Sequence, residues 1–274
     1  MERSHLLYKA ARLSYIRFGS GPNVAVCFHG YGEDATSFSF LERHAGNEFT
    51  FYAPDLPFHG ETTWPDTKPF THVDLENVVN EMLHQEHSII NEKTKLTLIG
   101  YSMGGRIALG LFQSKPAIVE RLVLLAPDGL KVNFWYWLAT QTWIGNSLFA
   151  FTMKHPQWFF GFLKLLDKLH MVNASIFKFV NYYIGDKDAR RLLYARWTTL
   201  RKLRPDLRKI KSLAKGNKTI VRLAYGKHDR IILPVRGKKF CKDIEEFCVI
   251  SVIPSGHQVL HEKNIHEILP ALLH

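Results

Sequence analysis

The stretch GYSMGG, residues 100–105, constrains the fold of this chain more than any other part of its sequence. It follows the apolar run LTLI and precedes the helical pattern RIALGLFQSK. A strand, then G-x-S-x-G, then a helix is the layout of a nucleophile elbow, a sharp turn that presents a serine at the carboxyl end of a strand. Glycine at positions 100 and 104 removes side chains that would collide with the adjacent strand and helix. We therefore predict an exposed Ser102 hydroxyl at the end of a sheet strand.

Short apolar runs alternate with amphipathic stretches along most of the chain, which is typical of βαβ units. The run KLTLIG before the serine is almost wholly apolar, as a strand in the buried middle of a parallel sheet would be. Helices are expected over residues 35–46, 72–91 and 258–273, and after the elbow. The other expected strands cover residues 13–19, 23–30, 49–55, 121–127, 219–226 and 247–254.

A serine hydroxyl is a weak nucleophile without a base, so a histidine and an acid are expected after later strands. The loop PSGHQVLHE follows the last expected strand and contains His257. The loop AYGKHDRIILP follows the strand before it and contains Asp229, while Asp128 follows an earlier strand and is an alternative acid. His261 lies four residues after His257, but no carboxylate or cysteine pattern supports a metal pair. No metal or cofactor is expected.

These motifs resemble those of the α/β-hydrolase superfamily, in the order serine, acid, histidine, over nearly the whole chain. CFHGYGED is similar to the family's HG loop and APDLPFHGET to its D-x-P-G-x-G loop, although Phe58 stands where glycine is usual. The resemblance implies an α/β-hydrolase fold, a mostly parallel central sheet flanked by helices with an inserted all-helical cap. Residues 1–127 and 214–274 would form the core, and residues 128–213 the cap.

The resemblance also implies a role for each site residue. Ser102 would attack an acyl carbonyl, His257 would take and return its proton, and Asp229 would orient the imidazole and stabilise its cation. The backbone N–H groups of Tyr31 and Met103 would stabilise the oxyanion. The expected function is therefore a serine hydrolase that cleaves a carboxylic ester or thioester through an acyl-enzyme.

Residues 128–213 break the alternation and are rich in aromatic and basic residues. From Lys131 to Lys211 there are 15 Lys and Arg and four acids, whereas the rest of the chain has 21 of each. Such a positive module would attract anionic substrates or an anionic membrane surface, so peripheral membrane contact is a hypothesis. No nucleic-acid-binding motif is evident. Residues 132–153 carry no charge, but their polar residues favour a buried or interfacial helix pair over a membrane span.

The aromatic residues of the insertion suit an apolar pocket, or else pack the insertion's own core, so a partly apolar substrate is expected. Trp135 and Trp158 are candidate substrate contacts within it. His29, Tyr101 and Arg106 are candidates in the core, with a loop-shaping role as the alternative for His29.

Two other functions remain open at this level. GYSMGGR resembles the elbow of SHCHC synthases, lyases of menaquinone biosynthesis with the same fold. In those lyases an arginine at the position of Arg106 helps to hold a substrate carboxylate, and Ser102 would then act as a base. The other alternative is a non-catalytic protein that binds a partner or membrane through its basic cap.

Cys27, Cys241 and Cys248 are odd in number and lack metal-ligand spacing. Cys27 and Cys248 lie in apolar strand-like runs, so buried thiols in a reducing compartment are expected. The N-terminus shows no signal-peptide pattern, and we expect a cytoplasmic protein. The oligomeric state stays open.

Overall fold

A computed structural model describes residues 1–65, 68–86, 94–131, 133–168 and 183–273 of the chain. The chain forms two compact units, one of Met1–Pro65, Phe70–Lys131 and Lys202–His274, the other of Asp66–Pro69 and Val132–Arg201. That residues 128–213 form a separate inserted domain stays a prediction. Residues 128–131 and 202–213 of that range belong to the first unit.

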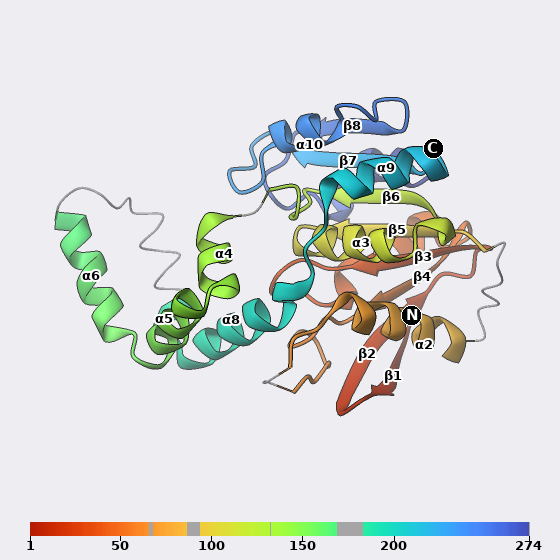
Figure 1. The fold of residues 1–274 in the computed structure, drawn as a ribbon. Coiled ribbons are helices and arrows are strands. Elements are labelled where there is room, and N and C mark those ends of the chain that lie inside the picture. Colours follow the sequence, from red (N-terminus) through yellow and green to blue (C-terminus); the bar gives the residue numbers. More distant parts are fainter. Residues whose placement is uncertain (66–67, 87–93, 132, 169–182, 274) are drawn as a thin grey trace. The chain divides into compact units, whose positions relative to one another are not determined.

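The first unit is built on an eight-stranded sheet with the order β1-β2-β4-β3-β5-β6-β7-β8 (Figure 1). The strands from β4 to β8 along this order pair in parallel, while β1 and β2 are antiparallel to their neighbours. The predicted fold class is confirmed. The strands are β1 (Glu2–Tyr8), β2 (Ala11–Phe18), β3 (Asn23–Phe28), β4 (Phe49–Pro54), β5 (Leu96–Tyr101), β6 (Val119–Leu125), β7 (Ile220–Gly226) and β8 (Cys248–Ile253).

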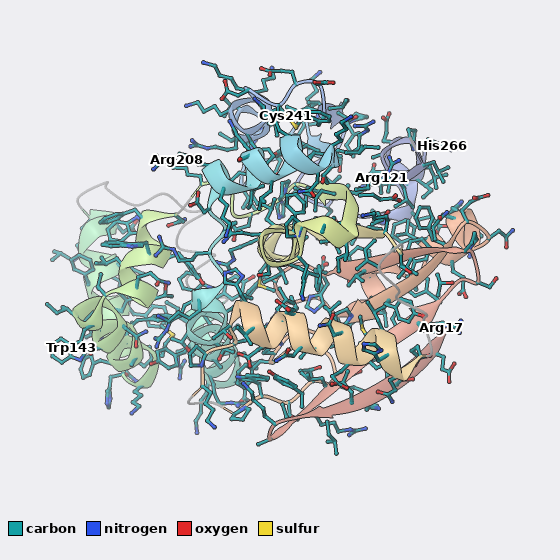
Figure 2. The ribbon with its side chains drawn as sticks, turned by 45° about the vertical axis from the view of Figure 1, so that its right-hand side comes forward. Arg17, Arg121, Trp143, Arg208, Cys241 and His266 are labelled. Carbon is teal, nitrogen blue, oxygen red and sulfur yellow. A yellow bond between two sulfur atoms is a disulfide. The ribbon has the colours of Figure 1, made fainter. Side chains whose placement is uncertain are left out.

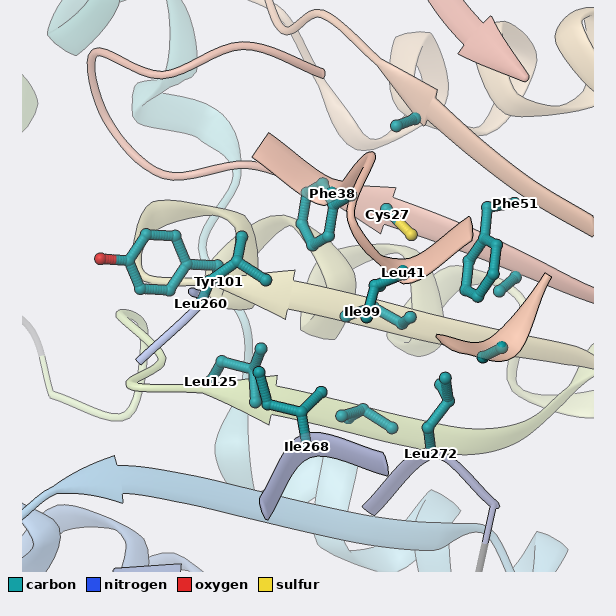
Figure 3. Packing of buried hydrophobic residues seen from close by; sticks show 14 of the residues in the cluster. Cys27, Phe38, Leu41, Phe51, Ile99, Tyr101, Leu125, Leu260, Ile268 and Leu272 are labelled. Atoms are coloured by element: carbon teal, nitrogen blue, oxygen red, sulfur yellow. The ribbon is translucent and has the colours of Figure 1, made fainter. Parts of the chain in front are cut away.

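Helices cover both faces of this sheet. On one face α2 (His72–Gln85) contacts α3 (Met103–Ser114), α3 contacts α9 (Leu207–Asn217), and α10 (Pro234–Cys241) lies beside α9. On the other face, α1 (Leu41–Ala45) and α11 (Ile265–Leu273) pack on the strands with the short 3-10 helix η1 (Ala35–Phe38). Figure 3 shows the apolar cluster between them, where Leu41 and Ile268 meet Ile99 of β5 and Leu125 of β6. The other 3-10 turns are η2 (Pro116–Ile118), η3 (Leu200–Lys202) and η4 (Glu262–Asn264).

Local sequence signals explain where α2 begins. Thr71 accepts a hydrogen bond from the Asp74 N–H, and the Asp74 carboxylate accepts one from the Thr71 N–H at 2.8 Å, which completes a capping box. Leu75, Val78 and Met82 then follow at helical spacing and are buried.

Three elements differ from the sequence prediction. The helix expected over residues 35–46 is instead the 3-10 helix η1 followed by the short helix α1. Helix α2 ends at Gln85, and residues 87–91 of the helix expected over 72–91 lie outside the described residues. Strand β1 was not predicted, because ERSHLLY is mostly polar and pairs only with β2 at the edge of the sheet. The C-terminal helix begins at Ile265 and not near Gln258. The residues between are held in turns: the Asn264 amide donates to the carbonyl oxygens of Gln258 (3.2 Å) and Val259 (2.9 Å).

In the part of the second unit that the structure describes, the α-helices are α4 (Phe134–Gln141), α5 (Trp143–Lys154), α6 (Gln157–Lys168) and α8 (Lys187–Thr199). The uncharged run is split between α4 and α5 at Thr142, whose backbone is extended and whose hydroxyl accepts from the Gly145 N–H at 3.0 Å. No helix that the structure describes has the length and apolar character needed to cross a membrane.

The prediction for the cysteines is partly wrong. Cys27 is buried and unpaired, but Cys248 forms a disulfide with Cys241 (Figure 2). Cys241 ends α10 and Cys248 begins β8, so the fold brings two residues seven positions apart to a Cα–Cα distance of 5.4 Å. The reducing compartment was expected because the cysteines were expected to be free thiols, and Cys248 is not one. The cytoplasmic location stays a prediction.

The backbone of Gly104 lies close to the backbone of β3, so we predict that Gly104→Ala is strongly destabilising. A Cβ at position 104 would overlap the Phe28 carbonyl oxygen of β3, which is backbone and cannot rotate away. We expect a loss of about 3 kcal/mol or more in the free energy of unfolding, measured by urea denaturation.

Gly216→Ala in α9 is the matched control, because a Cβ there meets no atom within 4 Å. Alanine in an exposed helical position should leave stability unchanged or raise it by up to about 1 kcal/mol. Equal unfolding midpoints for the two variants would contradict this account of the elbow.

Candidate active site

Ser102 lies in a strained turn between β5 and α3. Its φ of +50° and ψ of −115° place a non-glycine residue in a region that L-amino acids rarely adopt. The turn is held by backbone hydrogen bonds, from the Ser102 N–H to the Leu125 oxygen (2.9 Å) and from the Asp128 N–H to the Ser102 oxygen (2.8 Å). Gly100 permits the close approach, because a Cβ there would collide with the backbone of Gly104 and Gly105. The turn aims the hydroxyl away from the strand.

The structure brings Ser102, His257 and Asp229 together in one hydrogen-bonded relay. Ser102 Oγ lies 3.0 Å from His257 Nε2, and His257 Nδ1 lies 2.8 Å from Asp229 Oδ2. A carboxylate can only accept, so Nδ1 carries the proton in the neutral ring and Nε2 accepts from the serine hydroxyl. This tautomer is the one that a general base needs.

The Asp229 carboxylate is fixed by its own loop. It is buried, and its Oδ1 accepts from the N–H groups of Ile231 (2.7 Å) and Ile232 (3.0 Å). The loop is tied to the segment that carries the histidine, since the His228 N–H donates to the Ser255 oxygen at 2.9 Å. One carboxylate oxygen is thus anchored by backbone while the other faces the imidazole.

The alternative acid, Asp128, has other contacts. Its Oδ1 accepts from the Gly129 N–H at 2.7 Å, and its Oδ2 lies 3.7 Å from Arg106 Nε. Arg106 is buried, whereas the Asp128 side chain of this ion pair is 41% exposed. The geometry favours Asp229 as the acid of the relay, and the role of Arg106 in holding substrate stays a prediction.

Tyr101 is a candidate substrate contact that the structure places behind the histidine. It is buried, its hydroxyl donates to the His257 carbonyl oxygen at 3.2 Å, and its ring centroid lies 5.7 Å from the imidazole. Burial raises the pKa of this phenol, with further contributions from Glu33 and Asp229, so the hydroxyl stays a donor. These contacts are those of a residue that positions His257.

His29 joins two loops at the same edge of the sheet. The Leu56 N–H donates to His29 Nε2 at 3.0 Å, so Nδ1 carries the proton and donates to the Gly30 oxygen at 2.8 Å. The ring is fully buried. Both nitrogens are engaged by backbone, which fits the loop-shaping alternative better than a contact with substrate.

The loop after β4 keeps the conformation that glycine favours, although Phe58 replaces glycine. Phe58 has a φ of +62° and Gly60 one of +51°. The buried Asp55 carboxylate holds this loop, because it accepts from the Glu61 N–H at 3.1 Å and from Arg3 Nη1 at 2.7 Å. Phe58 thus keeps a left-handed conformation that costs a non-glycine residue about 1–2 kcal/mol.

The two expected oxyanion donors follow the carboxyl ends of neighbouring strands, Tyr31 after β3 and Met103 after β5. Met103 is the first residue of α3, where N–H groups have no partner within the helix. Tyr31 directly follows Gly30, whose oxygen accepts from the Glu33 N–H at 3.3 Å in a tight turn. Their roles toward an oxyanion stay predictions.

Trp135 and Trp158 belong to the second unit, on α4 and α6, and both are exposed. Their contact with substrate stays a prediction. His261 caps the start of η4, where its Nδ1 accepts from the Lys263 N–H at 3.1 Å. Among the described residues, no three His, Cys, Asp or Glu side chains are grouped as ligands for a metal ion.

Sequence reasoning missed Glu33, which lies in the loop before η1. Its Oε2 accepts from the Gly30 N–H at 3.3 Å, and His257 is near enough to lower the pKa of this carboxyl. A signal was present, because an acid three residues after the glycine of an HG loop can bond back to that turn. The positioning role of Tyr101 had no such signal, since it depends on a contact 156 residues away.

A doubly wound sheet with helices on both faces, and a Ser-His-Asp relay at the carboxyl ends of its strands, define a hydrolase-type α/β protein. Residues 25–271 match the sequence model of the alpha/beta hydrolase family. The chain belongs to the alpha/beta hydrolase family.

Known relatives agree with this family. The chain is 27% identical to the uncharacterized hydrolase YugF of Bacillus subtilis, over 89% of this chain and 86% of that protein. It is 26% identical to a pimeloyl-[acyl-carrier protein] methyl ester esterase of Nitrosospira multiformis, over 43% of this chain and 44% of that one. A thermophilic esterase from Thermogutta terrifontis has a similar fold, with a TM-score of 0.67, 17% identity and coverage of 98% and 96%.

Glu33 predicts a pH dependence of stability. Burial raises the pKa of Glu33 above its ordinary value of 4.5, against the lowering effects of the Gly30 N–H, Ser37 and His257. The folded state therefore binds the proton more tightly than the unfolded state. This contribution to stability is complete below pH 4.5 and is lost as pH rises through the folded pKa.

Glu33→Gln keeps an acceptor for the Gly30 N–H and removes the titration. We expect the variant to be more stable than the wild type at neutral pH, with the difference shrinking as the pH is lowered toward 4.5. Thermal unfolding of both proteins across this range measures it. A difference that does not vary with pH would contradict the burial of a carboxylate at this position.

Proposed function

We propose that this protein is a serine hydrolase that cleaves a carboxylic ester or thioester through an acyl-enzyme on Ser102. The observation that carries the proposal is the relay from Ser102 Oγ through the His257 ring to Asp229, with steps of 3.0 and 2.8 Å. Each step joins a donor to an acceptor in the direction that proton transfer requires.

In the acylation step, Ser102 Oγ attacks the acyl carbonyl carbon while its proton passes to His257 Nε2. The carbonyl oxygen becomes an oxyanion, which the N–H groups of Met103 and Tyr31 would stabilise together with the amino end of α3. The buried Asp229 carboxylate stabilises the imidazolium. When the tetrahedral intermediate collapses, Nε2 gives its proton to the departing alkoxide or thiolate, and the acyl group stays on Ser102.

Deacylation repeats the sequence with water. Water gives a proton to His257 Nε2 and adds to the acyl carbon, and the collapse returns that proton to Ser102 Oγ as the carboxylic acid leaves. The chain supplies every group in this scheme from its own side chains and backbone.

Similarity supports the reaction class but not the substrate. The Nitrosospira relative is named for a methyl ester esterase activity, and the Thermogutta structure is described as an esterase. We propose a partly apolar substrate, because the second unit is rich in aromatic side chains that line apolar pockets well. The lyase alternative would use Arg106 for a substrate carboxylate, and the Arg106–Asp128 pair argues against it.

A fluorophosphonate probe tests the nucleophile. We expect covalent labelling of the wild type and none of Ser102→Ala, with hydrolysis of p-nitrophenyl esters reduced by a factor on the order of 10⁴ or more in the variant. A folded wild-type protein that resists labelling would rule out the acyl-enzyme and favour the lyase or the non-catalytic alternative.

Two aspartates allow a matched comparison of the acid. Asp229→Asn should lower kcat on the order of 10⁴-fold, because an amide stabilises the wrong tautomer of His257. Asp128→Asn keeps an acceptor for the Gly129 N–H and should change kcat by less than about tenfold. A larger loss in Asp128→Asn than in Asp229→Asn would transfer the role of the acid to Asp128.

A further inference from the structure

The second unit has a continuous surface of apolar side chains that do not pack in its own interior. On α5, Trp143 and Ile144 expose 82% and 73% of their surface, and Leu148 and Phe151 are also exposed. We call these four residues, with Trp158 and Phe162 of α6, the apolar face. Trp143 lies at the edge of the helices of this unit (Figure 2).

The exposed apolar residues of α5 form one stripe along that helix, and those of α6 form another. Ile144, Leu148 and Phe151 are four and three residues apart and lie on one side of α5. Trp158, Phe162 and Leu165 repeat that spacing on α6, and Leu165 is also exposed. The rings of Phe151 and Trp158 join the stripes, with centroids 6.4 Å apart.

The interior of the unit is formed by other sides of the same helices. Phe149 of α5 packs on Tyr194 and Trp197 of α8, with ring centroids at 5.2 and 5.5 Å. Leu163 of α6 is buried in a small cluster with Ile184. Each helix therefore has one apolar side that packs inside the unit and a second that faces outward. An outward apolar surface of this extent marks an interaction site.

The charged residues beside the apolar face indicate what kind of partner binds there. Residues 133–168 hold three lysines, Lys154, Lys164 and Lys168, against a single acid. Lys154 follows Phe151 by three residues and Lys168 follows Leu165 by three, so each lysine lies near the border of its stripe. Long lysine stems can lie along an apolar surface while their ammonium groups reach anionic headgroups.

We propose that the apolar face docks on the surface of an anionic phospholipid bilayer. Its tryptophan and phenylalanine rings enter the boundary between headgroups and acyl chains, and the bordering lysines bind phosphate and carboxylate groups. The 12 residues of α5 span only ~18 Å, too short for a hydrocarbon core, so the helices lie in the plane of the interface. In this proposal Trp158 contacts lipid instead of the substrate, which was its predicted partner.

Vesicle binding tests the proposal without any catalytic step. The full chain, in a Ser102→Ala background that leaves the lipids intact, is sedimented with vesicles of phosphatidylcholine alone or mixed with phosphatidylserine. We expect binding to the mixed vesicles that weakens steeply with salt, and binding to pure phosphatidylcholine that is at least about tenfold weaker. No binding to the mixed vesicles at low salt would overturn the proposal.

Matched variants locate the surface. Trp143→Ser with Phe151→Ser should weaken binding at least about tenfold, because two buried rings are lost. Lys154→Glu with Lys168→Glu should remove the preference for phosphatidylserine, because these lysines border the two stripes. Leu7→Ser is the control, an apolar residue of β1 that is 85% exposed, and it should bind like the parent protein. Equal binding by the Trp143 and Phe151 double variant and the control would place the docking surface elsewhere and overturn the proposal.

The other occupant to be tested is a second copy of the chain. Sedimentation velocity without lipid should give the same species for the wild type and for Trp143→Ser with Phe151→Ser. A wild-type dimer that this variant converts to monomer, together with no vesicle binding, would assign the apolar face to self-association and overturn the membrane proposal.

Discussion

The strained backbone at Ser102 is the constraint on which the rest of the site depends. Its positive φ turns the chain from β5 into α3 within one residue, and the absence of side chains at Gly100 and Gly104 lets the turn pack against β3. This one geometry aims the hydroxyl at His257 and brings the first N–H groups of α3 beside it. The energy that holds the strain comes from the buried strands on either side and not from the turn itself.

Residues around the relay restrict its motion by contacts to backbone. Tyr101 bonds the His257 carbonyl, the Ile231 and Ile232 amides hold one oxygen of Asp229, and His29 ties the loops after β3 and β4 together. Each of these groups meets its partner near the carboxyl ends of the parallel strands. A side chain held in this way needs little reorganisation when charge develops, which is the condition for efficient electrostatic stabilisation.

The sequence predicted those features that depend on local pattern. Apolar runs located β2 to β8 within a few residues, and G-x-S-x-G with the later Asp and His identified the residues of the relay. Features that depend on distant contacts were missed. Strand β1 is polar and defined by its pairing with β2, the Cys241–Cys248 disulfide depends on where α10 ends, and Tyr101 acts through a carbonyl far along the chain. Phe58 shows the same limit, because tertiary contacts impose a left-handed conformation that its own preferences oppose.

The central claim is that one serine, one histidine and one aspartate act together on an acyl group. A crystal structure of the protein after reaction with a p-nitrophenyl phosphonate tests it most directly. We expect phosphorus bonded to Ser102 Oγ, its oxygen within hydrogen-bond distance of the Met103 and Tyr31 N–H groups, and the His257 ring still hydrogen-bonded to Asp229. Phosphonate attached to another residue, or an imidazole turned away from both Ser102 and Asp229, would contradict it.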